Sequence, residues 1–406
     1  MNRRHVLVAG CAASAATSGC DLSFRDGIFN DCRADLAPDL RDHPLVRAAW
    51  RGLDTAQVWD THCHIFGSGD SGSGLWFNPR MKNIRQPRGY VQREFYVNAA
   101  CVDYAVGKVD RSFEARLLDQ CRAMPAGFRV LLFSFDWARD DAGVPMQQHS
   151  TFHVPDDYVA GLAQRHPAHF GWVASIHPSD PRALDRLDAA ATRGARAVKW
   201  LPSAQNIDPA SARCDAFFAR LVTLRLPLIT HAGDEQAVHG FAEHLGNPLR
   251  LRRALDAGVR VVVAHCASLG SGEDTDHNSS TLRPNFELFA RLMDDPRYRS
   301  SLSGDIAAIT QSRRRSVIAP LLERRDWQER LLNGSDYPLP GVVPLINLRA
   351  LAESNLLDPA TLEPLRRLRD TNVLLFDFVL KRSLAVDGQA FAAGVFETAP
   401  FFERLS

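Results

Sequence analysis

The sequence shows little imbalance of charge and no long apolar run, and these absences exclude several classes of protein. Its 406 residues carry 48 Lys and Arg against 47 Asp and Glu, and no block of like charges stands out. A nucleic-acid-binding protein usually presents a strongly basic face, which this composition does not supply. No stretch of about 18 apolar residues is present, so no segment is expected to cross a membrane as a helix. Biased tracts and repeats are absent too, which leaves a globular protein of one large domain or two smaller ones.

Cysteine and lysine are both scarce. The eight cysteines form no CxxC pair and no tight spacing pattern. A chain of this length therefore needs no disulfide scaffold. Only Lys82, Lys108, Lys199 and Lys381 are lysines, so Arg serves almost everywhere that a plain cation would suffice. Lys199, which closes a predicted strand, therefore stands out as a candidate for a specific role.

The first twenty residues have the three parts of an export signal. Arg3 and Arg4 precede a short apolar stretch, and small residues lead up to Cys20. The arginine pair resembles a twin-arginine signal and the end resembles a lipoprotein processing site, although Thr17 stands where Leu is usual. We therefore predict a signal peptide over 1–20, with export to the periplasm or to a membrane through a lipid anchor at Cys20. The alternative is the ordinary N-terminus of a cytoplasmic protein.

From residue 58 onward, short apolar runs alternate with segments of helical period. The runs are 58–66, 129–137, 170–177, 195–202, 226–233, 259–266, 299–308 and 330–338. Several helical segments between them end in Gly, the usual helix C-cap. Eight such units predict an α/β fold, a distorted (β/α)8 TIM barrel over 58–385. The longest helical stretch is expected from about Tyr90 to Cys121. Residues 21–57 are expected to be an N-terminal extension with one helix at Leu40–Trp50, and 386–406 a C-terminal tail.

The placement of polar residues favours a closed barrel over an open sheet. No glycine-rich dinucleotide-binding motif follows any predicted strand. At about 4.8 Å per strand, an open sheet would separate the first and eighth strands by about 34 Å. Closure would bring the strand ends to one mouth, where barrel enzymes carry their sites. The polar residues that end predicted strands one, four, five, six and eight are His62 and His64, Lys199, His231, His265 and Asp336.

The segment DTHCH at 60–64 is a candidate metal-binding motif. Alternate side chains of a strand share a face, so His62 and His64 point the same way and could hold one divalent ion at about 2.1 Å each. Alone, such a pair is weak evidence, but His231 and His265 at later strand ends strengthen it. Asp336 completes the set, because a buried carboxylate is costly unless it meets a cation or a metal.

Taken in order, the motifs DTHCHIF, ITHAG, AHC and GSDYP resemble those of the amidohydrolase superfamily. The similarity is greatest to its amidohydrolase-2 branch, which includes aminocarboxymuconate-semialdehyde decarboxylase, and it extends from about residue 58 to 338. The resemblance implies a distorted TIM barrel with a divalent metal, usually Zn²⁺, in its mouth. The metal ligands that it implies are His62, His64, His231 and Asp336. His265 would bind a second metal or hydrogen-bond the water and the substrate.

The expected chemistry follows from the charge of the ion. Bound Zn²⁺ lowers the pKa of water to about 7. Asp336 would then accept the proton and return it to the leaving group, while the metal or His265 polarises the carbonyl. In the superfamily a Lys like Lys199 is carbamylated between two metals or accompanies a single one; the alternative is a cation that compensates a buried carboxylate. One or two metals, and the choice among zinc, manganese, iron and cobalt, stay open.

The loops supply the remaining candidates. Residues 67–74 read as a flexible lid or as a solvated linker, and the cluster SRRRS at 312–316 as a solvated helix face. Asp136 and Asp305 end strands two and seven and are expected to orient metal ligands. An Arg could hold a substrate carboxylate through two hydrogen bonds. The candidate substrate-binding residues are Trp76, Arg80, Arg85 and Arg88.

Three functions are compatible with these features. The first is a metal-dependent hydrolase of a small ester, amide or lactone. The second is a metal-dependent, non-oxidative decarboxylase of a small carboxylic acid, and the third is a metal-dependent binding lipoprotein without turnover. Asp336 disfavours the third, because a binding protein needs no proton shuttle. The expected partner is a small molecule rather than a nucleic acid, and the sequence leaves a homo-oligomer open.

Overall fold

Eight short parallel strands form the centre of the part of the chain that the structure describes. The computed structural model describes residues 27–103, 105, 107–238, 240–276 and 281–403. The strands are β1 (Trp59–His64), β3 (Arg129–Phe133), β5 (Phe170–Val173), β6 (Val198–Trp200), β7 (Leu228–His231), β8 (Val261–Ala264), β11 (Leu302–Asp305) and β12 (Leu331–Leu332). Each lies inside one of the eight predicted segments, which confirms those predictions. The predicted signal peptide and Cys20 lie outside the described residues.

The strands close into a ring with two irregular joints. One arc has the order β1-β3-β5 and the other β12-β11-β8-β7-β6. A parallel bridge between Ala174 and Val198 joins β5 to β6, and another between Cys63 and Tyr337 joins β1 to the segment after β12. The register of β1 against β3 also shifts between Asp60 and Cys63. The fold is therefore a distorted TIM barrel, as predicted.

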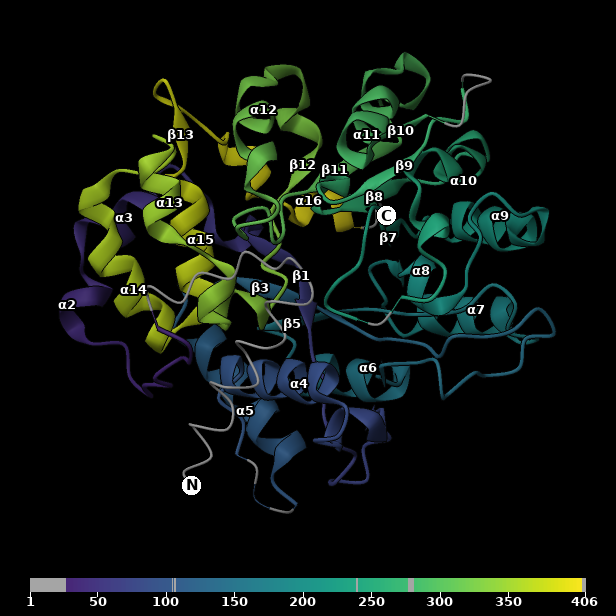
Figure 1. Ribbon diagram of the computed structural model, residues 1–406, viewed down its shortest axis with the longest axis horizontal. Coiled ribbons are helices and arrows are strands. Elements are labelled where there is room, and N and C mark those ends of the chain that lie inside the picture. The colour runs from purple at the N-terminus through teal and green to yellow at the C-terminus, as the bar shows by residue number, and fades with distance from the viewer. Residues whose placement is uncertain (1–26, 104, 106, 239, 277–280, 404–406) are drawn as a thin grey trace.

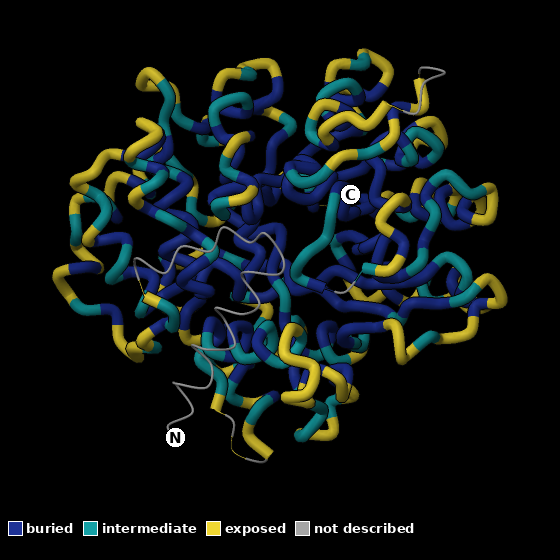
Figure 2. The backbone as a smooth tube through the Cα atoms, in the orientation of Figure 1, coloured by how far each residue is buried: buried dark blue, intermediate teal, exposed yellow. Residues whose placement is uncertain are grey.

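Helices surround the ring (Figure 1). They are α4 (Pro87–Ala99), α5 (Val109–Arg122), α6 (Asp156–Arg165), α7 (Ala183–Thr192), α8 (Pro202–Gln205), α9 (Asp215–Leu224), α10 (Arg252–Asp256), α11 (Asn285–Asp294), α12 (Ile318–Glu323), α13 (Leu348–Glu353), α14 (Leu362–Thr371) and α15 (Val373–Ser383). Each amphipathic helix turns one face inward: in α11 the residues Leu288, Phe289 and Leu292 are fully buried, at the i, i+1, i+4 spacing of one helix face. Figure 2 accordingly shows buried backbone in the middle of the ring and exposed backbone around its edge. No helix among the described residues is long and apolar enough to span a bilayer.

Short strand pairs lie outside the ring. They are β2 (Trp76–Phe77) with β4 (Phe152–His153), β9 (Ser271–Glu273) with β10 (Leu282–Pro284), and β13 (Ala385–Val386) with β14 (Gln389–Ala390). The first pair is antiparallel and joins the loop after β1 to the loop after β3. It therefore builds part of one side of the mouth.

The strand alternation fills the barrel with apolar residues and sends polar ones to its mouth. Ala197 and Ile229 belong to a small buried cluster with inward residues of the other strands. Because side chains two positions apart share a face, Lys199 and His231 point into the same interior one layer higher. The helix α16 (Ala399–Phe402) contributes Ala399 and Phe402 to that cluster, so the C-terminal segment closes the other end of the barrel.

The N-terminal segment packs onto the barrel and is tied to it covalently. The helix α3 (Pro44–Trp50) contacts α15, and the Trp50 ring stacks on Phe378 with centroids 4.0 Å apart. Cys32 forms a disulfide with Cys101, with Cα atoms 5.5 Å apart. Sequence analysis did not predict this pair, because the two cysteines are 69 positions apart and only the fold brings them together.

Two predicted helices are interrupted. The stretch from Tyr90 to Cys121 forms α4 and α5, separated where Cys101 adopts a left-handed backbone conformation with φ 54°. Likewise the helix predicted at Leu40–Trp50 is divided into α2 (Pro38–Arg41) and α3. Pro44 causes the second break, since proline disfavours a helical conformation in the residue before it.

Candidate metal centre

The mouth of the barrel holds a cavity of about 340 Å³. Polar groups from the strand ends form its floor, and apolar side chains from α4 and from the segment after β12 form much of its wall. The floor residues are His62, His64, Lys199, His231, Glu235, His265 and Asp336. Closure of the barrel therefore unites all six residues that the sequence placed at strand ends.

His62, His64 and Asp336 converge on one point. The Nε2 atoms of His62 and His64 are 3.2 Å apart. Oδ1 of Asp336 lies 3.2 Å from Nε2 of His64 and 3.5 Å from Nε2 of His62. Burial alone would raise the pKa of the Asp336 carboxyl, but His265 and the hydrogen-bonded His64 hold that pKa well below its ordinary value. The carboxylate is therefore ionised at neutral pH.

Asp305 orients the ring of His62, as the sequence suggested. Nδ1 of His62 lies 2.8 Å from Oδ2 of Asp305 and donates to it, since a carboxylate only accepts. The other oxygen accepts the backbone N–H groups of His265 and Ala307, at 2.7 and 3.0 Å. The pKa of His62 is well below its ordinary value, mainly because the ring is buried. Nε2 of His62 therefore carries a lone pair that faces His64 and Asp336.

His265 is fixed in the corresponding way. Its Nδ1 donates to the carbonyl of Ala307 at 2.9 Å, and burial lowers its pKa to about 3. Nε2 is therefore unprotonated and lies 3.9 Å from Oδ2 of Asp336. The backbone of His265, Cys266 and Ala267 is left-handed, with φ of 56°, 49° and 49°. Such a run is strained for residues with a Cβ and commonly marks a functional site.

His231 lies on the opposite side of the floor, next to a carboxylate that sequence analysis missed. Its Nε2 is 3.0 Å from Oε2 of Glu235, yet both ring nitrogens are buried and make no hydrogen bond within the described structure. The backbone N–H groups of Ala237 and Val238 hold the other oxygen of Glu235. The only sequence signal for Glu235 was its position four residues after His231, in the loop that follows a strand end.

Lys199 is buried at the floor with a side chain that faces the acidic groups. Its Nζ lies 5.0 Å from the centroid of the Phe133 ring, and the residue is 2% exposed. Burial lowers the pKa of Lys199 to about 8, partly offset by Asp305 and Asp336. Most of the amine is therefore protonated at neutral pH, but about a tenth of it can lose its proton at pH 7, which Arg could not do.

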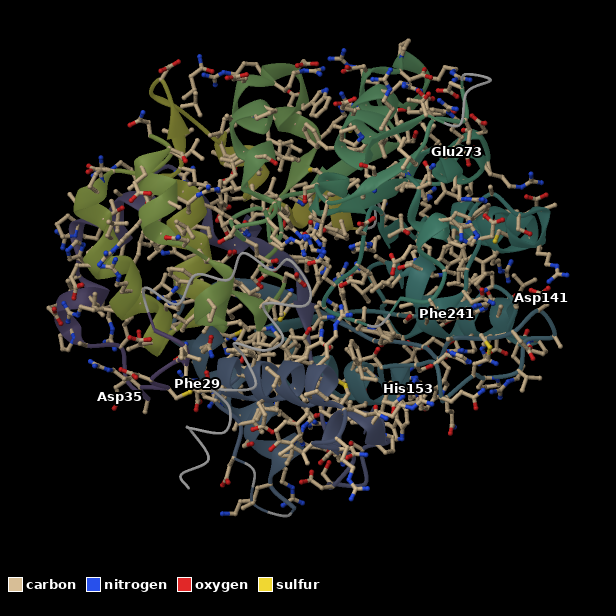
Figure 3. All side chains as sticks on the ribbon, in the orientation of Figure 1. Phe29, Asp35, Asp141, His153, Phe241 and Glu273 are labelled. Carbon is tan, nitrogen blue, oxygen red and sulfur yellow. A yellow bond between two sulfur atoms is a disulfide. The ribbon has the colours of Figure 1, made fainter. Side chains whose placement is uncertain are left out.

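The candidate substrate-binding residues divide into two groups. Arg88, at the start of α4, lines the cavity. Arg80 and Arg85 are exposed and are not among the lining residues. Trp76 packs instead on Trp137, with ring centroids 4.9 Å apart, and Trp137 stacks on His153. His153 lies toward the lower right of the view, away from the centre of the ring (Figure 3).

The cluster SRRRS is not simply a solvated helix face. Arg314 is 5% exposed and lines the cavity, whereas Arg313 and Ser316 are exposed. Residues 312–314 form a turn after β11, and a short 3-10 helix begins at Arg315. The side chain of Arg314 donates a hydrogen bond to the hydroxyl of Ser268 at 3.1 Å. Three consecutive arginines give no sequence signal for which one turns inward.

Two further predictions concerned Asp136 and the loop 67–74, and the structure describes both. Asp136 does not touch the histidine cluster. Its carboxylate binds Arg186 at 2.7 Å and accepts a hydrogen bond from the backbone N–H of His177.

The loop 67–74 is held to the start of α5 by hydrogen bonds. The carboxylate of Asp110 accepts hydrogen bonds from the hydroxyls of Ser71 and Ser73, and the carboxylate of Asp70 accepts one from the backbone N–H of Asp110.

The donor set fits a divalent ion. Bonds of about 2.1 Å at near-tetrahedral angles place neighbouring ligand atoms about 3.4 Å apart, which matches the separations of 3.2 to 3.5 Å among His62, His64 and Asp336. The buried ring nitrogens of His231 are polar atoms without a hydrogen-bond partner among the described residues, as expected of a group that awaits a ligand. His231 lies outside the tight group of three, so it would close the set from the other side.

The family model described as Amidohydrolase, Amidohydro_2, matches residues 59–364, more than half of the chain. The chain belongs to this family. The match runs from β1 to the first turn of α14 and so includes every residue of the cavity floor. The resemblance drawn from the sequence motifs is thereby confirmed.

Solved structures similar to this chain are distant in sequence. An uncharacterised TIM-barrel protein from Bordetella bronchiseptica is 16% identical, with a TM-score of 0.45 over 79% of this chain and 99% of that one. A proposed 2-pyrone-4,6-dicarboxylic acid hydrolase from Pseudomonas putida is 17% identical, with a TM-score of 0.41 over 79% and 97%. 5-Carboxyvanillate decarboxylase from Novosphingobium aromaticivorans, solved with manganese, is 13% identical, with a TM-score of 0.41 over 78% and 93%. No curated protein sequence matches the chain.

Proposed function

We propose that this amidohydrolase is a metal-dependent hydrolase that cleaves a small ester, amide or lactone, with Zn²⁺ held by His62, His64, His231 and Asp336. The observation that carries the proposal is the placement of Asp336. One oxygen of this ionised carboxylate faces the histidine pair, and the other lies 3.9 Å from Nε2 of His265. The same group can therefore hold an ion and exchange a proton with a molecule in the cavity.

Asp336, His265 and Lys199 have separate roles beside the bound ion. A divalent ion bound at this site supplies Lewis acidity, which polarises a carbonyl and makes a water molecule acidic near neutral pH. Asp336 accepts the proton of the attacking water at its carboxylate and returns it to the leaving group. His265 presents an unprotonated Nε2, so it accepts a hydrogen bond and keeps a water molecule oriented. Lys199 offsets the negative charge of Asp305 and Asp336.

The reaction type can be tested by following solvent oxygen. The protein, reconstituted with zinc, is incubated with a panel of esters, lactones and amides in water enriched in ¹⁸O. The proposal predicts a carboxylate product that carries one solvent oxygen, and loss of turnover when a chelator removes the zinc. Release of carbon dioxide without solvent oxygen in the organic product would contradict it.

Non-oxidative decarboxylation is the second candidate, and Lys199 favours it. A buried cation at the cavity floor can receive the carboxylate of a substrate before the C–C bond breaks. Asp336, which is ionised, would first take a proton from a water molecule and then pass it to the carbon that loses carbon dioxide. The isotope experiment separates the two reactions on the same samples. A binding protein without turnover is disfavoured, since it would gain nothing from an ionised Asp336 that faces the cavity.

We also propose that the protein is exported. The arginine pair near the N-terminus and Cys20 suggest an export signal with a lipid anchor. The disulfide between Cys32 and Cys101 supports the proposal, since such bonds persist in oxidising compartments such as the bacterial periplasm. Mass spectrometry of protein recovered from membranes tests it. Cleavage before Cys20 with an added lipid is expected, and an intact Met1 terminus would contradict it.

A further inference from the structure

Arg314 is a buried cation for which the proposed hydrolysis has no use. It lies in the turn after β11, and its backbone N–H is held by the carbonyl of Gln311 at 2.8 Å. Its side chain enters the cavity wall on the side of His231 and His265, where its positive charge lowers the pKa of both rings in addition to the effect of their burial. The guanidinium is therefore close enough to the floor to meet a molecule bound there.

This guanidinium has unused hydrogen-bonding capacity. A guanidinium offers five N–H donors in a planar fork. Within the described part of the chain, Arg314 donates one side-chain hydrogen bond, from Nη1 to the neutral hydroxyl of Ser268 at 3.1 Å, and takes part in no ion pair. Burial lowers its pKa, whereas Glu235 and Asp336 attract the charge from a distance and raise it. Arg stays protonated under such conditions, so a buried charge is left without a contacting counter-ion.

The rest of the cavity favours an anionic ligand with an apolar body. Four cations line it against two carboxylates: Arg88, Lys199, Arg313 and Arg314, and Glu235 and Asp336. Of those carboxylates, Asp336 faces the histidine pair and Glu235 is held by backbone N–H groups. Apolar side chains form the wall: Phe66, Val91, Phe95, Phe135, Leu339 and Val342.

We propose that Arg314 is the receptor for a carboxylate of the substrate, whose apolar, ring-sized body packs against the wall formed by α4 and the segment after β12. A planar carboxylate matches the free edge of the guanidinium through two parallel hydrogen bonds. The inference rests on the proposed function, because the anchored molecule would thereby present its reacting carbonyl to the histidine cluster. The substrate class is therefore an apolar organic acid that carries an ester, amide or lactone.

Binding of a matched probe pair tests the proposal. Naphthalene-2-carboxylate and naphthalene-2-carboxamide have nearly the same shape and differ in charge. Calorimetric titration of the full-length protein, zinc-loaded and after chelator treatment, is expected to show at least about tenfold tighter binding of the carboxylate in both states. Arg314→Gln should abolish this preference in the metal-free protein and leave the zinc affinity within about twofold. Arg315→Gln, which removes the same charge outside the cavity lining, should preserve the preference.

Arg314→Lys keeps the positive charge but loses the paired N–H donors of the guanidinium. It keeps the proposal testable if Arg314→Gln fails to fold. It should retain a preference that is several-fold weaker than that of the wild type. Equal binding of the two probes by the metal-free wild-type protein would overturn the proposal, and so would an undiminished preference in Arg314→Gln. Failure to bind zinc, or to hydrolyse any substrate, with the Arg314-dependent preference intact would reject the proposed function and leave the carboxylate receptor standing.

Discussion

At the scale of single residues, the site depends on which atom of each histidine carries a proton. Asp305 and the carbonyl of Ala307 each accept a hydrogen bond from the Nδ1–H of a buried ring, His62 and His265 respectively. The Nε2 atoms are thereby left free to act as ligands or acceptors. Burial keeps the pKa values of both rings low, so the lone pairs persist at neutral pH.

Replacing Asp336 should separate proton transfer from metal binding. Asp336→Asn keeps an oxygen that can face the ion but cannot accept a proton. We expect kcat to fall by about 10²- to 10⁴-fold, the usual contribution of general acid–base catalysis. The measurement is kcat at saturating zinc, with metal content determined by elemental analysis of the same sample. Full turnover by the metal-loaded variant would show that Asp336 is no proton shuttle.

Replacing Asp305 should weaken metal binding without removing a ligand. Asp305→Asn can no longer fix the Nδ1 proton of His62 in the same way, and loss of such a partner usually costs about 10- to 100-fold in metal affinity. The matched control is Asp136→Asn, since Asp136 lies just after the strand β3 but binds Arg186 rather than the histidine cluster. Zinc affinity from competition with a chromogenic chelator should fall in the first variant only. Equal losses in both would contradict an orienting role for Asp305.

At the scale of elements, strands and the terminal helix hold the site in different ways. The strands position the ligands, because their ends converge where the barrel closes. The helix α16 instead fills the other end of the barrel, where Phe402 joins the interior cluster and the hydroxyl of Thr398 donates to the carbonyl of Trp59 at 2.6 Å. The segment from Thr398 to Phe402 therefore contributes to the stability of the barrel although it lies far from the metal centre in sequence.

Truncating Phe402 of α16 should destabilise the barrel. Phe402→Ala removes a ring that is 2% exposed, and such core truncations cost about 3–5 kcal/mol in the free energy of unfolding. Phe401→Ala is the control, because Phe401 is partly exposed and packs under Arg260. Urea unfolding of the two metal-free variants measures the difference. A loss in Phe402→Ala no larger than in Phe401→Ala would refute the role of α16.

The sequence predicted the elements of the barrel better than the contacts between its loops. All eight strands could be found because apolar runs ending in His, Lys or Asp are local patterns. Glu235 and Arg314 could not be assigned, since each lies in a loop whose path depends on packing against other loops. The break between α4 and α5 was missed for a similar reason: Cys101 ends the helical region where it bonds to Cys32, far away in the sequence.

At the scale of the whole molecule, buried neutral histidines make folding sensitive to acid. His177 is 1% exposed; its Nδ1 accepts the backbone N–H of Ser179, and Nε2 donates to the carbonyl of Gln205. Burial lowers the pKa of His177 from 6.5 to about 4. As the pH falls below 6.5, the unfolded chain gains a proton that the folded chain cannot yet accept, so stability is lost.

This effect can be isolated by comparison with a variant that does not titrate. Between pH 6.5 and 5 the free energy of unfolding of the metal-free protein should fall by about 1.6 kcal/mol more than that of His177→Gln, because the slope approaches about 1.4 kcal/mol per pH unit only well below pH 6.5. Urea titrations at several pH values provide the measurement, and a chelator removes the contribution of zinc. Parallel pH profiles for the two proteins would mean that His177 titrates normally in the fold.

We propose above all that His62, His64 and Asp336 share one ion at the mouth of a closed barrel. An anomalous difference map from zinc-loaded crystals, collected at the zinc absorption edge, tests it most directly. We predict a strong peak about 2.1 Å from Nε2 of His62, Nε2 of His64 and an oxygen of Asp336, with His231 turned toward it. A peak elsewhere, or no peak at full zinc loading, would show that these three residues do not share an ion.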